Sequence, residues 1–144
     1  PRLQDFSPQA LANTAWAFAK MGVDAPRLFA AIADVRRASP TRLAQPRVRD
    51  FNPQNLANTA WAFAKTGVEA SRLFAAISDA ARPRLGEFNS QDMANTSWAF
   101  ATAGVWAFAT LGVDAPRTAP RLFAGIANAA QSRLREFDPQ NFAN

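Results

Sequence analysis

The chain repeats one motif along its length, and this internal repetition restricts the possible folds more than any other feature. The segment DFSPQALANTAWAFAKMGV begins at Asp5 and returns as DFNPQNLANTAWAFAKTGV at Asp50. It returns again as EFNSQDMANTSWAFATAGV at Glu87, and a fourth copy, EFDPQNFAN, begins at Glu136. A chain built from copies of one unit is typical of repeat architectures, in which each unit packs against its neighbours.

The spacing of the units is uneven. Each unit begins with an anchor phenylalanine: Phe6, Phe51, Phe88 and Phe137. These residues lie 45, 37 and 49 positions apart, and we take 37 residues as the period. The first interval carries extra residues in the segment 36–49, which is rich in Arg and Pro. The third is longer because WAFATAGV at 98–105 is followed directly by WAFATLGV at 106–113, and because APR recurs four positions later. We therefore expect a single helical-repeat domain over 1–144, a piece of a longer protein, with units at about 6–50, 51–87, 88–136 and a truncated 137–144.

Each unit has the pattern of two helices joined by a turn. The first begins at a short polar residue that can cap free backbone N–H groups, and in three of the four units proline follows at a position that suits a helix start. It is expected to end at a glycine, which tolerates the left-handed conformation of a helix C-terminus. These glycines are Gly22, Gly67 and Gly104. Second helices are predicted over 26–37, 71–82 and about 120–133, where apolar residues recur at helical spacing.

No segment shows the alternating pattern of a strand, so the predicted fold class is all-α. Two amphipathic helices cannot bury their apolar faces alone, whereas stacked pairs share a continuous core. The expected architecture is therefore an α-solenoid of stacked helical hairpins.

The duplicated octet at 106–113 leaves two conformations open. It can lengthen the first helix of the third unit through Gly104 by about two turns, or it can loop out. Met93 to Val113 also lacks charged residues over 21 positions, which is long enough for a membrane span. The segment is rich in Ala, however, and it carries five Asn, Ser and Thr side chains. We therefore expect no membrane span.

The residue types that the chain lacks exclude most catalytic chemistry. It contains no cysteine, histidine or tyrosine. Disulfides, thiolate zinc sites, cysteine nucleophiles and the Ser-His-Asp triad are therefore absent. The 11 acidic residues lie mostly beside anchor phenylalanines or at helix starts, as capping residues do. We expect no enzyme, no metal and no cofactor.

The basic residues favour an anionic partner. The chain carries 16 Lys and Arg against 11 Asp and Glu, a net charge of +5, and only Lys20 and Lys65 are lysines. Arginine binds phosphate through two parallel hydrogen bonds and stacks on bases. A genome rich in G and C also enriches Ala and Arg without functional cause, and this alternative stays open. The arginines that we assign to binding this anionic partner are Arg36, Arg37, Arg82 and Arg84.

The first helices carry a repeated row of polar and aromatic residues. At 100° per residue, Leu11, Ala15, Phe18 and Ala19 form the buried side, whereas Gln, Asn, Trp and Lys cluster within about 60° of one another elsewhere. Amides can read base edges, an indole can stack on a base, and a cation can hold the backbone. The candidate RNA-binding residues are Gln9, Asn13, Lys20, Gln54, Asn58, Lys65, Gln91 and Asn95, with Trp16, Trp61 and Trp98 for base stacking. In the third unit Thr102 replaces the lysine.

Residues that are identical in every unit cannot discriminate between bases. The position after each glutamine varies most, as Ala10, Asn55, Asp92 and Asn141. We expect it to carry any base preference, so Asn55 and Asp92 join the candidate RNA-binding residues. Each part of the row also has a structural alternative: the tryptophans can pack between hairpins, the asparagines can bond to a neighbouring helix, and the lysines can complement the helix dipole.

The motif resembles a known class of repeats. The pattern F-x-P-Q-x-L-A-N-T-A-W-A-F-A-K-x-G-V, followed by R-L-F-A-A-I, is similar to the helical repeats that accompany RAP domains in algal and protist organelle proteins. These are the octotricopeptide and heptatricopeptide families, which are distantly related to FAST-kinase-domain proteins. The resemblance covers essentially the whole chain, and the 37-residue spacing matches the heptatricopeptide length. No RAP domain is visible, and the two longer intervals depart from the family's spacing.

The resemblance implies a non-catalytic protein that binds RNA in mitochondria or chloroplasts, in transcript maturation, stability or translation, or as a component of a mitochondrial ribosome. It implies that Gln9, Asn13, Lys20 and their equivalents face the RNA. The expected partners are single-stranded or structured mRNA or rRNA, and other proteins of a ribonucleoprotein assembly. The alternative function is a protein–protein scaffold in a large organellar assembly.

Overall fold

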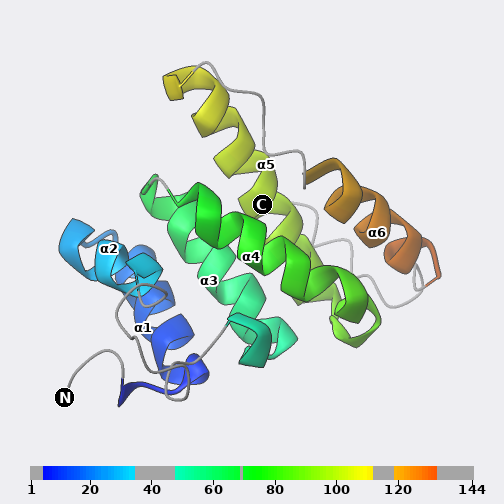
Figure 1. The fold of residues 1–144 in the computed structure, drawn as a ribbon, viewed down its shortest axis with the longest axis horizontal. Helices are drawn as coiled ribbons and strands as arrows, with labels where there is room; N and C mark the ends of the chain where they lie inside the picture. The colour runs from blue at the N-terminus through cyan, green and yellow to red at the C-terminus, as the bar shows by residue number, and fades with distance from the viewer. Residues whose placement is uncertain (1–4, 35–47, 69, 112–118, 133–144) are drawn as a thin grey trace.

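The computed structural model describes residues 5–34, 48–68, 70–111 and 119–132, with the backbone alone at 34, 105–111 and 119. These residues form helices and no strand, so the all-α class is confirmed (Figure 1). The six α-helices are α1 (Pro8–Met21), α2 (Pro26–Asp34), α3 (Pro53–Thr66), α4 (Ser71–Ala81), α5 (Ser90–Leu111) and α6 (Ala119–Ser132). Two short 3-10 helices, η2 (Val48–Asp50) and η3 (Arg82–Glu87), precede α3 and α5.

The predicted starts of the first helices are confirmed at atomic level. The Ser7 hydroxyl accepts a hydrogen bond from the backbone N–H of Ala10 at 3.2 Å, and Pro8 follows as the first helical residue. In the second unit, Asn52 Oδ1 accepts from the N–H of Asn55 at 2.8 Å. Each cap satisfies a backbone donor that has no partner inside the helix.

The predicted ends are confirmed in two units and wrong in the third. Gly22 and Gly67 both have φ 66°, the left-handed conformation that ends α1 and α3. Helix α5, in contrast, continues through Gly104 to Leu111, so the octet lengthens the helix. The sequence after Gly104, VWAFATL, contains no proline or further glycine, and each added residue contributes a helical hydrogen bond. These bonds outweigh the cost of about 1 kcal/mol for a glycine inside a helix.

The second helices agree closely with the prediction. Helix α2 begins at Pro26 as expected, and residues 35–37 of the predicted helix lie outside the described ranges. Helix α4 ends at Ala81, where the chain tightens into η3, and α6 is displaced by one residue from the predicted span. None of the described helices has both the length and the apolar character to cross a bilayer, as expected.

The first helices of successive units pack against one another, α1 on α3 and α3 on α5, while α2, α4 and α6 lie beside them (Figure 1). Edge-to-face phenylalanine pairs connect the two sets of helices. Phe29 of α2 contacts Phe63 of α3, and Phe74 of α4 contacts Phe100 of α5, each with ring centroids 5.1 Å apart. The second helix of one unit thus packs on the first helix of the next. The predicted buried side of α1 is confirmed for Leu11, Ala15 and Ala19, and Phe18 is half-buried.

Replacing Gly22 with alanine tests the left-handed cap. A Cβ at Gly22 would meet no atom within 4 Å, so the effect comes from backbone conformation alone. We expect Gly22→Ala to lower the free energy of unfolding by about 1 kcal/mol in urea titrations. Gly86→Ala is the matched control, because Gly86 also has open space around its Cα but lacks a positive φ. An equal loss in both variants would contradict the role of the cap.

Candidate nucleic-acid interface

The predicted row of polar residues reaches the surface in all three units. The glutamines Gln9, Gln54 and Gln91 are exposed on α1, α3 and α5. The asparagines follow one turn later: Asn13 is exposed, and Asn58 and Asn95 are half-buried. Lys20 and Lys65 are exposed at the helix ends, whereas the equivalent Thr102 is half-buried. Because α3 contacts both α1 and α5, these side chains form a row across three adjacent helices. We call this set the amide row.

Two of the three tryptophans beside the amide row contact each other, and two have exposed rings. The rings of Trp61 and Trp98 have centroids 6.0 Å apart and tilt by 34°. Trp61 is half-buried against the core, whereas Trp16 and Trp98 are 40% and 36% exposed. Lys20 Nζ lies 5.9 Å from the centroid of the Trp16 ring, within the range of a cation–π contact. Packing between helices, the structural alternative, therefore accounts for part of the Trp61 surface and leaves ring surface of Trp16 and Trp98 accessible.

Neighbouring amides within the row are paired in the third unit. Gln91 Nε2 donates a hydrogen bond to Asn95 Oδ1 at 2.9 Å, across one turn of α5. The bond orients both amide groups and leaves the Gln91 oxygen and the Asn95 NH₂ group to meet a ligand. An oriented amide loses less conformational entropy when it binds.

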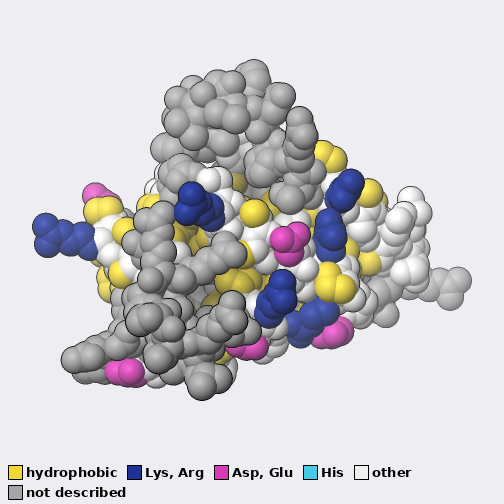
Figure 2. Space-filling model, in the orientation of Figure 1, with side chains coloured by type: hydrophobic (Ala, Val, Ile, Leu, Met, Phe, Trp, Pro, Cys, Tyr) yellow, Lys and Arg dark blue, Asp and Glu magenta, His cyan; other side chains and the backbone are white. Residues whose placement is uncertain are grey.

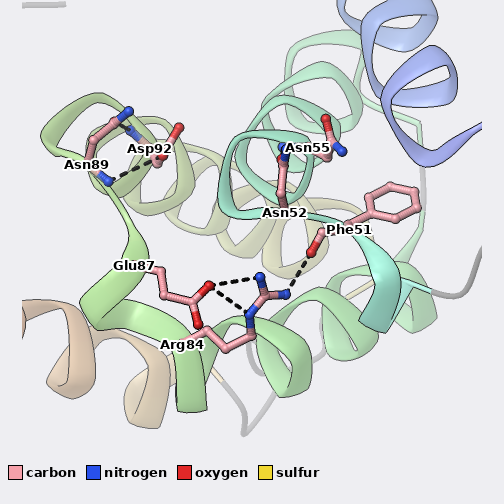
Figure 3. A network of polar contacts seen from close by, with 7 residues as sticks. All are labelled: Phe51, Asn52, Asn55, Arg84, Glu87, Asn89 and Asp92. Atoms are coloured by element: carbon pink, nitrogen blue, oxygen red, sulfur yellow. Dashed lines mark hydrogen bonds and ion pairs between the residues drawn. The ribbon is translucent and has the colours of Figure 1, made fainter.

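The position expected to carry base preference is buried. Asn55 and Asp92 are 5% and 6% exposed, although both are polar. Figure 3 shows their place at the starts of α3 and α5. The expectation that these two side chains contact bases therefore loses its geometric basis. The helical spacing of one helix taken alone could not predict this burial, because burial depends on how the helices pack together.

Asp92 has a structural task at the start of α5. Its carboxylate accepts from the N–H of Asn89 at 3.3 Å, and Asn89 Oδ1 accepts from the N–H of Asp92 at 2.7 Å. These reciprocal bonds form a capping box. Burial raises the pKa of the Asp92 carboxyl above its ordinary value, and the hydrogen bond from Asn89 opposes this shift with a smaller effect.

Arg84, which we assigned to RNA binding, makes its contacts in the structure within the protein (Figure 3). Its Nη1 donates to the backbone oxygen of Phe51 at 2.7 Å, and its Nε and Nη2 donate to Glu87 Oε2 at 3.1 and 2.9 Å. The guanidinium thus connects η3 to the residue before the α3 cap. The sequence contains a signal for this role, because R-x-x-[D/E]-F recurs before every unit, at 2–6, 47–51, 84–88 and 133–137.

The remaining arginines lie apart from the amide row in the chain. Arg82 is exposed on η3, and the predicted Arg36 and Arg37 lie outside the described residues. Among the described ranges, arginines occur on α2, α4, α6 and the two 3-10 helices, and none occurs on α1, α3 or α5. Figure 2 shows Lys and Arg side chains around α4, η3 and α6, interspersed with Asp and Glu. The row itself therefore relies on Lys20 and Lys65 for positive charge.

Comparisons with known proteins add no assignment. No protein-family model matches the chain, and no curated protein or solved structure matches it significantly. Within the described residues, no three acidic side chains gather closely enough to hold a metal ion.

Arg84→Ala tests the connection between η3 and α3. The substitution removes the charged donor that bonds to the partly buried backbone oxygen of Phe51. We expect the unfolding free energy to fall by about 1 kcal/mol after allowing for solvent screening. Arg82→Ala, two residues away and exposed, removes the same charge and should change stability by less than about 0.5 kcal/mol. Similar losses for the two variants in urea denaturation would show that Arg84 has no special role.

Asp92→Asn tests the buried carboxyl and introduces the residue that the second unit carries as Asn55. The folded protein holds the Asp92 proton at a higher pH than the unfolded chain, because its folded pKa is raised. Its contribution to stability therefore increases as the pH falls from neutral through the raised pKa. As the pH falls over this range, we expect the unfolding free energy of the unchanged protein to rise relative to that of Asp92→Asn.

The measurement is urea denaturation at successive pH values, with Asp79→Asn as the exposed control for net charge. A constant difference between the unchanged protein and Asp92→Asn over the whole range would contradict the raised pKa.

Proposed function

We propose that this segment binds single-stranded RNA, without catalysis, along the amide row of an α-solenoid formed by its stacked helical hairpins. The observation that carries the proposal is that glutamine is exposed at the same position on three adjacent helices, beside asparagines and tryptophans that are exposed or half-buried. Side chains needed only for packing would not have to recur as amides at positions that face solvent. A recurring exposed set suits a polymer whose own units recur.

The chemistry of the row matches the parts of a nucleotide. The amides of Gln9, Gln54 and Gln91 offer both donors and acceptors, which suit the edges of unpaired bases. The accessible ring surfaces of Trp16 and Trp98 suit base stacking, which contributes about 1–3 kcal/mol per base. Lys20 and Lys65 stand at the same end of adjacent helices, where each can neutralise a phosphate.

The small number of cations on the row sets the expected dependence on salt. Two neutralised phosphates of a single strand give a slope of log affinity against log salt of about −1.4, at about −0.7 for each phosphate. A steeper slope would indicate that arginines of the second helices, such as Arg82, join the contact. The resemblance to octotricopeptide and heptatricopeptide repeats supports RNA of a mitochondrion or chloroplast, including a mitochondrial ribosome, as the target.

The test measures the binding of labelled single-stranded RNA by fluorescence anisotropy at several salt concentrations. We expect Lys65→Gln to weaken binding and to reduce the magnitude of the slope by about 0.7, because one phosphate contact is lost. Trp98→Leu is expected to weaken binding about 5-fold or more with an unchanged slope, because stacking is not screened by salt. Arg72→Gln on α4 is the control: it removes one exposed charge outside the row.

Other results would redirect the proposal. Absence of binding at low salt, or binding that does not depend on salt, would contradict it and favour the scaffold alternative. Equal effects of Lys65→Gln and Arg72→Gln would show that net charge, and not the amide row, determines the affinity.

A further inference from the structure

One arginine recurs at the same place in each unit and does not belong to the amide row. Arg27, Arg72 and Arg121 each begin an R-L-F motif, and each lies in the first turn of a second helix, on α2, α4 and α6. All three side chains are exposed. None of them forms a hydrogen bond or an ion pair with the described residues. We call these three residues the arginine row.

The arginine row does not stabilise the helices that carry it. The helix dipole disfavours a cation in the first turn of a helix, whereas it favours Lys20 and Lys65 in the last turns of α1 and α3. Arg72 does not pack on the core either, because the buried Phe74 and Ile77 lie about 160° and about 140° away from it around α4. A charge that recurs against the local preference of its helix indicates a contact outside the protein.

The arginine row and the amide row lie on opposite surfaces of the packed helices. Phe63 of α3 contacts α2, and Lys65 lies about 160° from Phe63 around α3, so Lys65 faces away from the second helices. Phe74 of α4 contacts α5, and Arg72 lies on the far side of α4 from that contact. The protein therefore has one polar surface on the first helices and a separate basic surface on the second helices.

The packing of the helices repeats the arginine row from unit to unit. Helix α2 packs on α3, and α4 packs on α5, through equivalent Phe pairs with the same centroid distance of 5.1 Å. Helix α6 contacts α4. Successive second helices therefore present one arginine each along the same surface. A regular series of single positive charges suits a polymer that carries a negative charge in every unit, as a nucleic acid does.

The surroundings of the arginine row suit a duplex better than a single strand. Two small residues follow each arginine at the third and fourth positions: Ala30 and Ala31, Ala75 and Ala76, Ala124 and Gly125. No aromatic side chain is exposed on the described parts of α2, α4 and α6, so this surface lacks the stacking platforms that hold single strands. It offers charge alone. A duplex presents its phosphates while its bases pair with each other.

The nearest carboxylates do not neutralise the arginine row. Asp24 precedes Arg27 by three residues and forms no ion pair with it among the described contacts. Asp79 follows Arg72 by seven residues, which is about 10 Å along α4. This separation exceeds the distance of about 8 Å over which charges act strongly at physiological salt. In α6, Asn128 stands at the position of Asp79 and carries no charge.

We propose that the arginine row binds the phosphate backbone of double-stranded RNA without regard to its sequence. Each guanidinium donates two parallel hydrogen bonds to one phosphate, a geometry that arginine provides and lysine does not. The choice of RNA rests on the proposed function, whereas the contact with a duplex rests on the arginine row alone. The protein then has two RNA surfaces, one for unpaired bases and one for paired segments.

The test measures the binding of a labelled, blunt-ended RNA duplex by fluorescence anisotropy at several salt concentrations. We expect Arg72→Gln to weaken binding about fivefold or more and to reduce the magnitude of the salt slope by about 0.9, the value for one phosphate of duplex DNA. Arg82→Gln is the matched control, because it removes the same charge from an exposed site at the other end of α4. Urea denaturation verifies the fold: Arg72→Gln should not lower the unfolding free energy, because the helix dipole disfavours this charge.

Absence of duplex binding at low salt, or equal effects of Arg72→Gln and Arg82→Gln, would overturn the proposal. Tighter binding of polyglutamate than of the duplex, with the same dependence on Arg72, would overturn it in favour of an acidic protein partner. Tighter binding of duplex DNA than of duplex RNA would overturn the assignment to RNA.

A comparison of two variants separates this proposal from the proposed function. Lys65→Gln should weaken the binding of single-stranded RNA and leave duplex binding unchanged, and Arg72→Gln should do the reverse. Loss of the first effect alone would contradict the role of the amide row and leave the arginine row in place. Loss of the second effect alone would overturn the arginine row and leave the amide row in place.

Discussion

Helix α3 lies between α1 and α5, so it has to bury two opposite sides at once. Helix α3 does so completely: Ala57 and Ala60 are fully buried on one side and Ala62 on the other, with Phe63 beneath the preceding second helix. Alanine suits this task because its short side chain lets two backbones approach while it keeps the highest helix propensity. The large apolar residues then fill the space between first and second helices, as the two Phe pairs do.

This double burial also explains where the polar row lies. Adjacent first helices cover two sides of such a helix, and second helices cover a third. Only one narrow strip of its surface then remains in contact with solvent. In the three units that the structure describes, glutamine occupies this strip and tryptophan lies at its border. Trp61, in the middle helix, is covered most, whereas Trp16 and Trp98 each have one uncovered flank. The partial burial of the tryptophans and the exposure of the amides thus have the same geometric cause, and both are independent of whether RNA binds.

The local features of the fold could be predicted from the sequence because each depends on a few adjacent residues. Ser7 and Asn52 cap the helices that they precede, and Gly22 takes the left-handed conformation before a segment that contains Pro26. The failures have a different origin. Gly104 follows the same motif as Gly22, but the residues after Gly104 favour a helix. Whether the helix ends at the glycine therefore depends on the residues that follow it.

The site was less predictable, because burial depends on neighbouring helices. Asn55 and Asp92 were chosen because their position varies between units, but variation does not show exposure, and both residues are buried in the folded chain. Arg84 has the composition of a phosphate ligand, yet it satisfies a backbone oxygen 33 positions away in the chain. Contacts over such separations leave only a faint trace in one sequence, here the repeated R-x-x-[D/E]-F.

The scarcity of cations limits the affinity that the proposed function would give. The described part of the amide row carries only Lys20 and Lys65 as cations, because Thr102 stands at the equivalent position of the third unit. Two phosphate contacts give weak binding to a single strand at physiological salt. If the row binds RNA, most of the binding energy would therefore have to come from stacking on the exposed rings of Trp16 and Trp98 and from hydrogen bonds of the amides.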